Sequence, residues 1–291
     1  MNGLAKFDIP ACGMCGSSDT KQYLSLFFEE CGEFKLVRCQ SCSFIYNSPR
    51  LTDEAISALY GPEYYVFHED AETCAFRMLE VYKRTVAVVC QIGIPGRIVL
   101  DIGSAKGYHL ALLKALGWHP VGIEISRGAA AFATQIWDVP VYCGRVEDYS
   151  EELSGKFHLV LASDVIEHVT DPRQFISSAA RVLADGGYLV IDTPNGNSQN
   201  LEMQGANWMG LNPFHIHFLS EQHFNTLAQT NGLEVVRIFS YGNKEQSIND
   251  RLQEIRRSRW KSQLLSGLGL YSVARRLKHG HLQKILMRMK R

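Results

Sequence analysis

Between residues 97 and 242 the chain alternates short apolar runs with segments of helical periodicity, and this alternation restricts its fold more than any other feature. We expect strands in RIVLDIG, PVGIEIS, VPVYCG, FHLVLASD and GYLVIDTPN, with GLEVVRIFSYG closing the series, and helices in YHLALLKALG, RGAAAFATQIW and PRQFISSAARVLA. Short β-branched runs separated by helices are typical of parallel βαβ units. The pattern therefore predicts an α/β fold, Rossmann-like and doubly wound, with a mostly parallel sheet.

The first 48 residues contain two CxxC pairs, CGMC and CQSC. Their thiols belong to Cys12, Cys15, Cys39 and Cys42. Two CxxC knuckles on adjacent turns supply four thiolates in the tetrahedral arrangement that zinc prefers. We therefore predict a small zinc ribbon over residues 1–48, in which zinc contributes directly to folding. The alternatives are two unrelated thiol pairs or a redox pair.

The rest of the chain divides by composition. Residues 49–94 read as a helical cap or linker, with a short helix up to Tyr60 and a longer one near 73–91. Residues 95–243 form the α/β domain, in which 204–220 are expected to act as a lid. Residues 244–291 are predicted to be a basic, amphipathic, helical tail.

Charge is unevenly distributed along a chain whose formal net charge is +0, with 30 basic and 30 acidic residues. Residues 251–291 hold 12 Lys or Arg against one acid, which leaves 18 basic and 29 acidic residues in the preceding part. An acidic body disfavours binding to a nucleic acid backbone. The tail is open to three interpretations: contact with an anionic membrane surface, contact with nucleic acid, or docking on the acidic body of its own or another chain.

Apolar residues make up 46% of the chain and aromatic residues 10%, enough to build a folded core. The apolar stretches are strand-sized and interrupted, and the N-terminus lacks a signal-peptide pattern. The expected location is the cytoplasm, with peripheral contact at the inner membrane face if the tail binds lipid.

The loop DIGSAKG follows the first expected strand of the α/β domain. Gly103 and Gly107 would let the backbone turn tightly beside a ligand. Glu124 ends the next strand, where an acid accepts hydrogen bonds from ribose hydroxyls. Asp101 would repel a pyrophosphate but attract a cation. These residues favour S-adenosylmethionine (SAM), whose ammonium and sulfonium groups are both positive.

The segments VLDIGSAKG, VGIEIS, HLVLASDVIEHVTDP and AARVLADGGYLVIDTPN resemble class I SAM-dependent methyltransferases over about residues 95–240. The N-terminal segment LVRCQSCSFIYNSPRLTDEAISALYGPEYY is similar to the N-terminal zinc ribbon of bacterial methyltransferases of sugar and natural-product pathways. It also resembles the deoxysugar C-methyltransferases, which carry a further C-terminal domain.

The resemblance implies a set of SAM-binding residues. In the family, the loop after the first strand lines the methionine part of SAM, and the acid after the second strand binds the ribose. A family Asp that meets the adenine is replaced here by Arg145, and Val146 or Glu147 would take over. The implied set is Asp101, Gly103, Gly107, Glu124, Val146, Glu147, Ser163 and Tyr65.

The stretch LASDVIEHVTDP places three titratable side chains at the mouth of the expected SAM site. Asp164, Glu167 and His168 stand at i, i+3 and i+4, so a helical turn would place them on one face. The first interpretation is that His168 acts as general base toward a hydroxyl, since its ordinary pKa is about 6.5. Asp164 and His215 are the other candidate catalytic residues.

A second interpretation is a divalent cation bound by Asp164, Glu167 and His168 together with His215 or His217 from NPFHIHFLS. Strand alternation would point both of these histidines to one side. This set resembles the sites of small-RNA 2′-O-methyltransferases and of O-methyltransferases of quinone synthesis. A third interpretation is purely structural, with the acids capping a helix.

Together these features predict a SAM-dependent methyltransferase with a structural zinc ion and a small-molecule or sugar acceptor in a biosynthetic pathway. The accepting atom is expected to be a hydroxyl oxygen, and less often a carbon. An RNA acceptor is the alternative among enzymes. A non-catalytic scaffold is the alternative outside them, although such a protein would be expected to have lost the glycines or the acid of the SAM loop.

Overall fold

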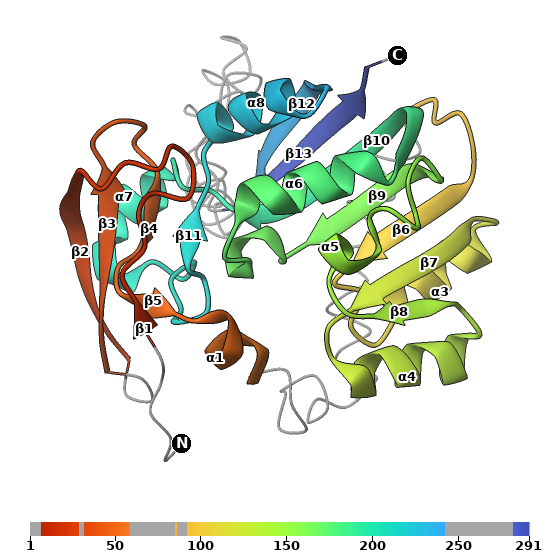
Figure 1. Ribbon diagram of the computed structural model, residues 1–291, viewed down its shortest axis with the longest axis horizontal. Coiled ribbons are helices and arrows are strands. Elements are labelled where there is room, and N and C mark those ends of the chain that lie inside the picture. The colour runs from red at the N-terminus through yellow and green to blue at the C-terminus, as the bar shows by residue number, and fades with distance from the viewer. Residues whose placement is uncertain (1–6, 29–31, 59–84, 86–91, 242–281, 291) are drawn as a thin grey trace, which may run out of the picture.

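The computed structural model describes residues 7–28, 32–58, 85, 92–241 and 282–290. Its centre is a seven-stranded sheet in the order β12-β13-β10-β9-β6-β7-β8 (Figure 1). These strands are β6 (Ile98–Ile102), β7 (His119–Glu124), β8 (Val141–Cys143), β9 (Phe157–Ser163), β10 (Leu183–Pro194), β12 (Leu233–Tyr241) and β13 (Leu282–Met289). From β8 to β10 all neighbouring pairs are parallel, whereas β13 is antiparallel to both of its neighbours. The predicted mostly parallel α/β sheet is confirmed.

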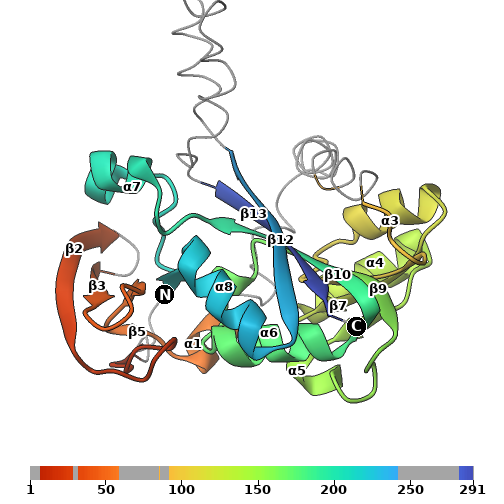
Figure 2. The same cartoon turned by 90° about the horizontal axis from the view of Figure 1, so that it is seen from above.

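Helices cover both faces of this sheet, as a continuous apolar strand requires. Leu159 to Ala162 in β9 are fully buried. The helices of the domain are α3 (Tyr108–Ala115), α4 (Arg127–Trp137), α5 (Val146–Tyr149), α6 (Pro172–Arg181) and α8 (Glu221–Thr230). Phe175 of α6 and Phe224 of α8 belong to the core on one face, and Leu113 of α3 to the core on the other (Figure 2).

The N-terminal part forms a second, four-stranded sheet in the order β11-β4-β3-β2. Three strands come from the N-terminus: β2 (Thr20–Phe28), β3 (Gly32–Cys39) and β4 (Ile45–Asn47). The fourth, β11 (His217–Phe218), comes from the segment expected to be a lid, and it pairs antiparallel with β4. The module and the lid are therefore one structural unit, not two.

Short elements complete the connections around this unit. They are β1 (Phe7–Asp8), β5 (Arg50–Leu51), α1 (Asp53–Ala58), α7 (Gln199–Gln204) and the two 3-10 turns Ile166–His168 and Gly205–Asn207. A small core of Leu26, Phe34, Leu36, Trp208 and Phe218 lies between the four-stranded sheet and the lid. Trp208 is 2% exposed, so it packs the lid against the sheet.

The predicted helical tail is wrong for the last described residues. Leu282–Met289 form β13, an inner strand of the central sheet, between β10 and β12. Ile285 and Met287 are fully buried there. Lys284, one of the cations that made the segment look like a surface helix, is 2% exposed and its Nζ pairs with Asp192 of β10. The cation has a buried counter-charge, which local sequence does not reveal.

Other predictions lie outside the described residues. These are Tyr65, the helix expected near 73–91 apart from Thr85, and residues 244–281 of the tail. Among the described residues, no helix combines the length and the apolar character needed to span a bilayer.

Candidate active site

The loop after β6 adopts the backbone conformations expected of a tight ligand loop. Gly103 and Gly107 have φ of 75° and 74°, and Ala105 between them has φ of 47°. A Cβ on Gly103 would lie 2.4 Å from Cγ2 of Val165, so only glycine fits against the turn after β9. The loop thus packs directly against the segment that carries Glu167 and His168.

Two buried carboxylates flank this loop at the ends of neighbouring strands. Asp101 and Glu124 are each 4% exposed. The Glu124 carboxylate accepts hydrogen bonds from the backbone N–H of Ala105 (2.8 Å) and of Ser126 (2.7 Å). Burial and the charge of Asp101 raise the pKa of Glu124, whereas these backbone donors lower it. Two acids in this position suit a cationic ligand that carries a ribose.

The third predicted part of the SAM site lies in α5 and at the end of β9. Val146 is buried, and burial raises the pKa of Glu147. Arg145, which stands where the family has an acid, pairs through Nη2 with Asp53 of α1 at 3.2 Å. Ser163 ends β9 beside Asp192 of β10. All of these residues lie at the carboxyl ends of parallel strands, where ligands bind in open α/β sheets.

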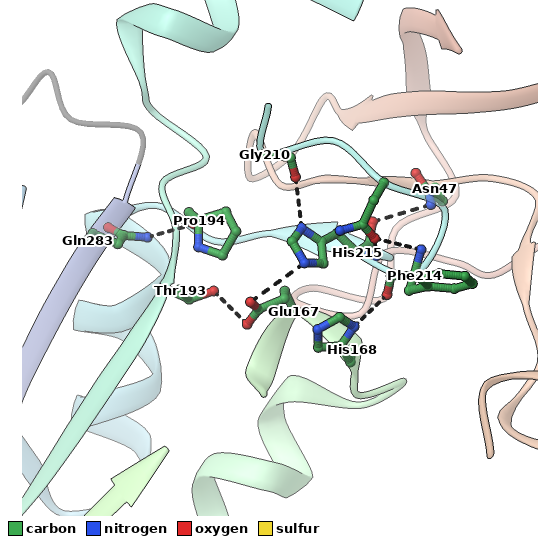
Figure 3. A network of polar contacts seen from close by, with 10 residues as sticks. Asn47, Glu167, His168, Thr193, Pro194, Gly210, Phe214, His215 and Gln283 are labelled. Carbon is green, nitrogen blue, oxygen red and sulfur yellow. Dashed lines mark hydrogen bonds and ion pairs between the residues drawn. The ribbon is translucent and has the colours of Figure 1, made fainter. Parts of the chain in front are cut away.

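The turn after β9 buries Glu167 completely. Its Oε2 accepts a hydrogen bond from Thr193 Oγ1 at 3.0 Å, while the buried Oε1 has no hydrogen-bond partner among the residues that the structure describes. Oε1 lies 3.9 Å from Nε2 of His215 (Figure 3). Desolvation, followed by the charge of Asp164, raises the pKa of Glu167 well above its ordinary value.

The rings of His168 and His215 contact each other edge to face beside this acid, with ring centroids 4.8 Å apart. Nδ1 of His168 lies 2.9 Å from the carbonyl oxygen of Phe214, and Nδ1 of His215 lies 2.8 Å from that of Gly210 (Figure 3). Because a carbonyl oxygen only accepts, each Nδ1 carries the ring proton and donates a hydrogen bond to the backbone. Each Nε2 is then unprotonated and has a lone pair.

Burial keeps both histidines neutral. Desolvation lowers the pKa of His168, and it lowers the pKa of His215 to about 3 with help from His168. Ligand atoms of Glu167, His168 and His215 lie within 4.8 Å of one another. The group offers two uncharged nitrogen acceptors and one carboxylate, which suits either proton removal or a divalent cation.

The structure does not bring Asp164 or His217 into this group, contrary to the predicted second metal set. The 3-10 turn begins at Ile166, so Asp164 precedes it, with φ of 53°, and does not share its face. Asp164 is exposed to solvent, although the protein around it still displaces part of its water. That desolvation and the charge of Asp192 raise the pKa of Asp164 to about 6.

His217 is buried in the four-stranded sheet instead. Its ring lies 5.4 Å from that of Phe44, and burial lowers its pKa to about 3. Strand β11 begins only at His217, so the alternation that was expected to align His215 with it does not extend that far. His215 sits in the preceding loop and turns toward Glu167.

The four cysteines of the two CxxC pairs come together as predicted. Their Sγ atoms lie within 4.8 Å of one another, with Cys12 to Cys42 and Cys15 to Cys39 both at 3.5 Å. A tetrahedral zinc ion with bonds of about 2.3 Å separates its sulfur ligands by about 3.8 Å. The thiol arrangement therefore fits one zinc ion.

Comparison with known proteins identifies the domain. A profile described as "Methyltransferase domain" matches residues 75–238. The chain belongs to this family. The prediction of a methyltransferase domain is confirmed.

Curated relatives of this methyltransferase domain include a Mycolicibacterium smegmatis protein named "Probable S-adenosylmethionine-dependent methyltransferase". It is 29% identical over 161 residues, which are 55% of this chain and 59% of the relative. A "Ubiquinone biosynthesis O-methyltransferase" of Aromatoleum aromaticum is 29% identical over 110 residues, 36% of this chain and 47% of that protein. The chain thus spans about half the length of these relatives.

The solved structure of a SAM-dependent methyltransferase from Archaeoglobus fulgidus shares the fold. It has 18% identity and a TM-score of 0.51, covering 72% of this chain and 93% of that one.

Two polar residues of the candidate site in the methyltransferase domain were not predicted from the sequence. Thr193, which donates to Glu167, lies at the end of β10, and the rule that ligand sites gather at strand ends was enough to suggest it. Asn47 contacts the His215 segment from β4. No sequence signal points to Asn47, because the pairing of β4 with β11 joins residues far apart in the chain.

Proposed function

We propose that this protein transfers the methyl group of SAM to a hydroxyl group of a small molecule or sugar in a biosynthetic pathway. The observation that carries the proposal is the pair of neutral imidazoles, His168 and His215, whose Nε2 atoms are free to accept while Nδ1 donates to the backbone. Relatives named for O-methylation support an oxygen acceptor.

The donor would lie over the loop after β6. Asp101 and Glu124 supply negative charge and ribose contacts, Gly103 and Gly107 allow close approach, and Val146, Glu147 and Ser163 would line the adenine and sulfonium ends. SAM provides a strong electrophile, so the protein needs only to align the acceptor oxygen and take its proton.

His168 is the proposed base. Its Nε2 accepts the hydroxyl proton as the oxygen attacks the methyl carbon and the sulfonium bond breaks. The hydrogen bond from Nδ1 to Phe214 fixes the ring and the tautomer. Because burial lowers its pKa, His168 is unprotonated at pH 7 and ready to accept.

A second candidate is a divalent cation held by Glu167, His168 and His215, and two observations favour it. Histidine ligands of metals typically donate their other N–H to a backbone carbonyl, as both do here. Oε1 of Glu167 is buried with no hydrogen-bond partner in the described part of the chain, and a cation would occupy its lone pair. Such an ion would acidify a bound hydroxyl.

We also propose a structural zinc ion at Cys12, Cys15, Cys39 and Cys42, supported by the fit of the four Sγ atoms to a tetrahedral site.

Transfer of a labelled methyl group from SAM tests the acceptor chemistry. Catechols, hydroxylated aromatic acids and hexoses would each be compared with a partner whose hydroxyl is already methylated or removed. Label in an ether methyl group of the hydroxyl compounds alone supports the proposal. Label on carbon or nitrogen, or transfer to RNA with no small acceptor, contradicts it.

Metal content separates the two candidates for the acceptor site. If a cation binds there, the zinc-loaded protein takes up one Mn²⁺ and Glu167→Gln takes up none, while the control Glu147→Gln binds as the wild type does. If His168 acts alone, the wild type takes up no Mn²⁺ and keeps its activity after dialysis against a chelator that leaves the cysteine site loaded.

A further inference from the structure

The segment that carries His215 is held between two parts of the molecule. On one side the backbone N–H of Ile216 donates to the carbonyl of Glu167 at 2.9 Å. On the other side the carbonyl of Ile216 accepts from the N–H of Asn47 at 2.8 Å. Ile216 is therefore hydrogen-bonded on both sides. One partner is β4, in the N-terminal part that contains the four cysteines (the cysteine module), and the other is the 3-10 turn of the methyltransferase domain that contains Glu167.

The side chain of Asn47 adds a contact to His215 itself. Asn47 is 1% exposed, and its Nδ2 donates to the carbonyl oxygen of His215 at 3.3 Å (Figure 3). Two contacts therefore orient His215. Its imidazole is hydrogen-bonded to the carbonyl oxygen of Gly210 in the lid, and its backbone carbonyl is hydrogen-bonded to the side chain of Asn47 in β4. The side chain of Asn47 is therefore placed to act on the acceptor site through His215, as a positioning residue.

Strand β4 follows directly from a cysteine knuckle. Only Ser43 and Phe44 separate Cys42 from its first residue, Ile45, and the N–H of Cys39 donates to the carbonyl of Phe44 at 2.9 Å. The Phe44 ring contacts the rings of His217 and His223 at 5.4 and 5.2 Å.

The knuckle is tied to the methyltransferase domain by one more bond. Nε2 of His223, in α8, lies 3.0 Å from the carbonyl oxygen of Cys42. Nδ1 of the same ring lies 3.0 Å from the backbone nitrogen of Ser220, which caps that helix and is the second residue after β11. The knuckle is therefore linked to the residues after β11 through His223, and Phe44 beside it contacts His217 in β11 itself.

The strands that make this connection are too short to persist alone. Strand β4 has three residues and β11 has two. A two-stranded pair is marginal by itself, so this pair depends on β3, to which β4 is also hydrogen-bonded, and on the module that contains β3. In a small module, metal binding supplies much of the folding free energy.

We propose that filling the four-cysteine site orders the acceptor site: the metal fixes the Cys39–Cys42 knuckle, the knuckle fixes β4, and β4 positions His215 through Asn47. The inference rests on the proposed function for the role of His215, but the mechanical coupling stands on these contacts alone.

Hydrogen–deuterium exchange on the full chain tests the coupling without any methyl transfer. The zinc-loaded protein is compared with protein stripped of zinc by a chelator and with the same sample reloaded. Amides of residues 44–48 and 211–219 should exchange faster by about tenfold or more after stripping and recover on reloading. Amides of 98–124 and the affinity for S-adenosylhomocysteine should stay unchanged. Unaltered protection of 211–219 overturns the proposal, and so does a general loss of protection.

Variants of Asn47 test the last link with zinc still bound. Asn47→Ala removes the donor, and Asn47→Asp keeps the shape but sets a carboxylate against the His215 carbonyl. Both should speed exchange in 211–219, keep one zinc per chain and lower kcat with an unchanged KM for SAM, and Asn47→Gln should restore part of the loss. Asn231→Ala is the control, since Asn231 Nδ2 also donates to a carbonyl, that of Leu227, far from the site.

Equal exchange in Asn47→Ala and Asn231→Ala would overturn the role of Asn47. A protein that shows the coupling but methylates no hydroxyl would instead contradict the proposed function and leave the coupling standing.

Discussion

His168 and His215 share one arrangement: a proton on Nδ1 held by a backbone carbonyl, and an Nε2 lone pair beside Glu167. Neutral imidazoles in this state are poor ion-pair partners and good acceptors, which is the property that the proposed chemistry needs. The chain separates them by 46 residues, so the folded structure, not local sequence, creates the site.

Removing the imidazole of His168 should abolish turnover but leave the donor site intact. We expect His168→Ala to lower kcat by about 100-fold or more, in the range typical of general bases, while the affinity for S-adenosylhomocysteine is unchanged. The exposed His119 gives the control His119→Ala. Retained turnover in His168→Ala, or lost binding of S-adenosylhomocysteine, would contradict the assigned role.

The two rings should also resist protonation. Burial lowers the pKa of His168 and brings that of His215 to about 3. The unfolded chain binds protons at the ordinary value of about 6.5, so these residues cost stability progressively as pH falls below that value. Imidazole shifts followed by NMR should show both rings neutral at pH 6.5 in the folded protein and half-protonated there in urea. A folded-state pKa at or above 6.5 for either ring would refute the burial argument.

The sequence predicted the positions of the proposed SAM-binding residues better than those of the proposed acceptor-site residues. Asp101, Gly103 and Glu124 follow from strand ends close together in sequence, so local reading placed them correctly at the carboxyl edge. Glu167 and His168 were also predicted to lie together, and the structure places their ligand atoms in one group, while their roles stay predictions. The choice between His215 and His217 depended on where β11 begins, and tertiary pairing with β4 decides that.

At the scale of elements, β13 is the largest departure from expectation. A strand inserted between β10 and β12 closes the hydrogen bonding of the sheet and buries Ile285 and Met287. Its cations made it resemble a surface helix, because sequence shows a charge but not its partner Asp192. Strands β6 and β9 carry nearly continuous buried apolar runs flanked by turns, and for that reason they were predictable.

Substitution in β13 should therefore affect global stability. Ile285 is fully buried, and Ile285→Ala should lower the free energy of unfolding by about 2–5 kcal/mol, the usual cost of a large cavity. Val236 in β12 is 48% exposed, and Val236→Ala should change it by less than about 1 kcal/mol. Urea denaturation measures both. Equal, small effects would mean that residues 282–289 lie outside the cooperative core.

At the scale of the whole molecule, the cysteine module and the methyltransferase domain form one unit. Sequence suggested two separate domains because each has its own motif. The structure joins them through the four-stranded sheet, whose fourth strand belongs to the lid. Strands of two and three residues are too short to show an alternating hydrophobic pattern in the sequence. The pairing of β4 with β11, which joins the two parts, was therefore not predictable.

Metal analysis tests the composition of that unit. The purified chain should contain one zinc ion, and Cys12→Ser should lose it together with part of the thermal stability, because zinc contributes to folding of small modules. Cys143 is exposed and apart from the cluster, so Cys143→Ser should keep the full zinc content. Wild-type protein that folds without zinc, or a Cys12→Ser variant that retains it, would exclude a structural zinc site.

The most direct test of the account is calorimetric titration of the zinc-loaded protein with S-adenosylhomocysteine, repeated with Glu124→Ala and with the exposed control Glu202→Ala. We predict a dissociation constant on the order of micromolar for the wild type and the control, and a loss of about 100-fold or more in Glu124→Ala. Absence of binding to the folded wild type, or equal binding by Glu124→Ala, would contradict the assignment of the SAM site and the activity built on it.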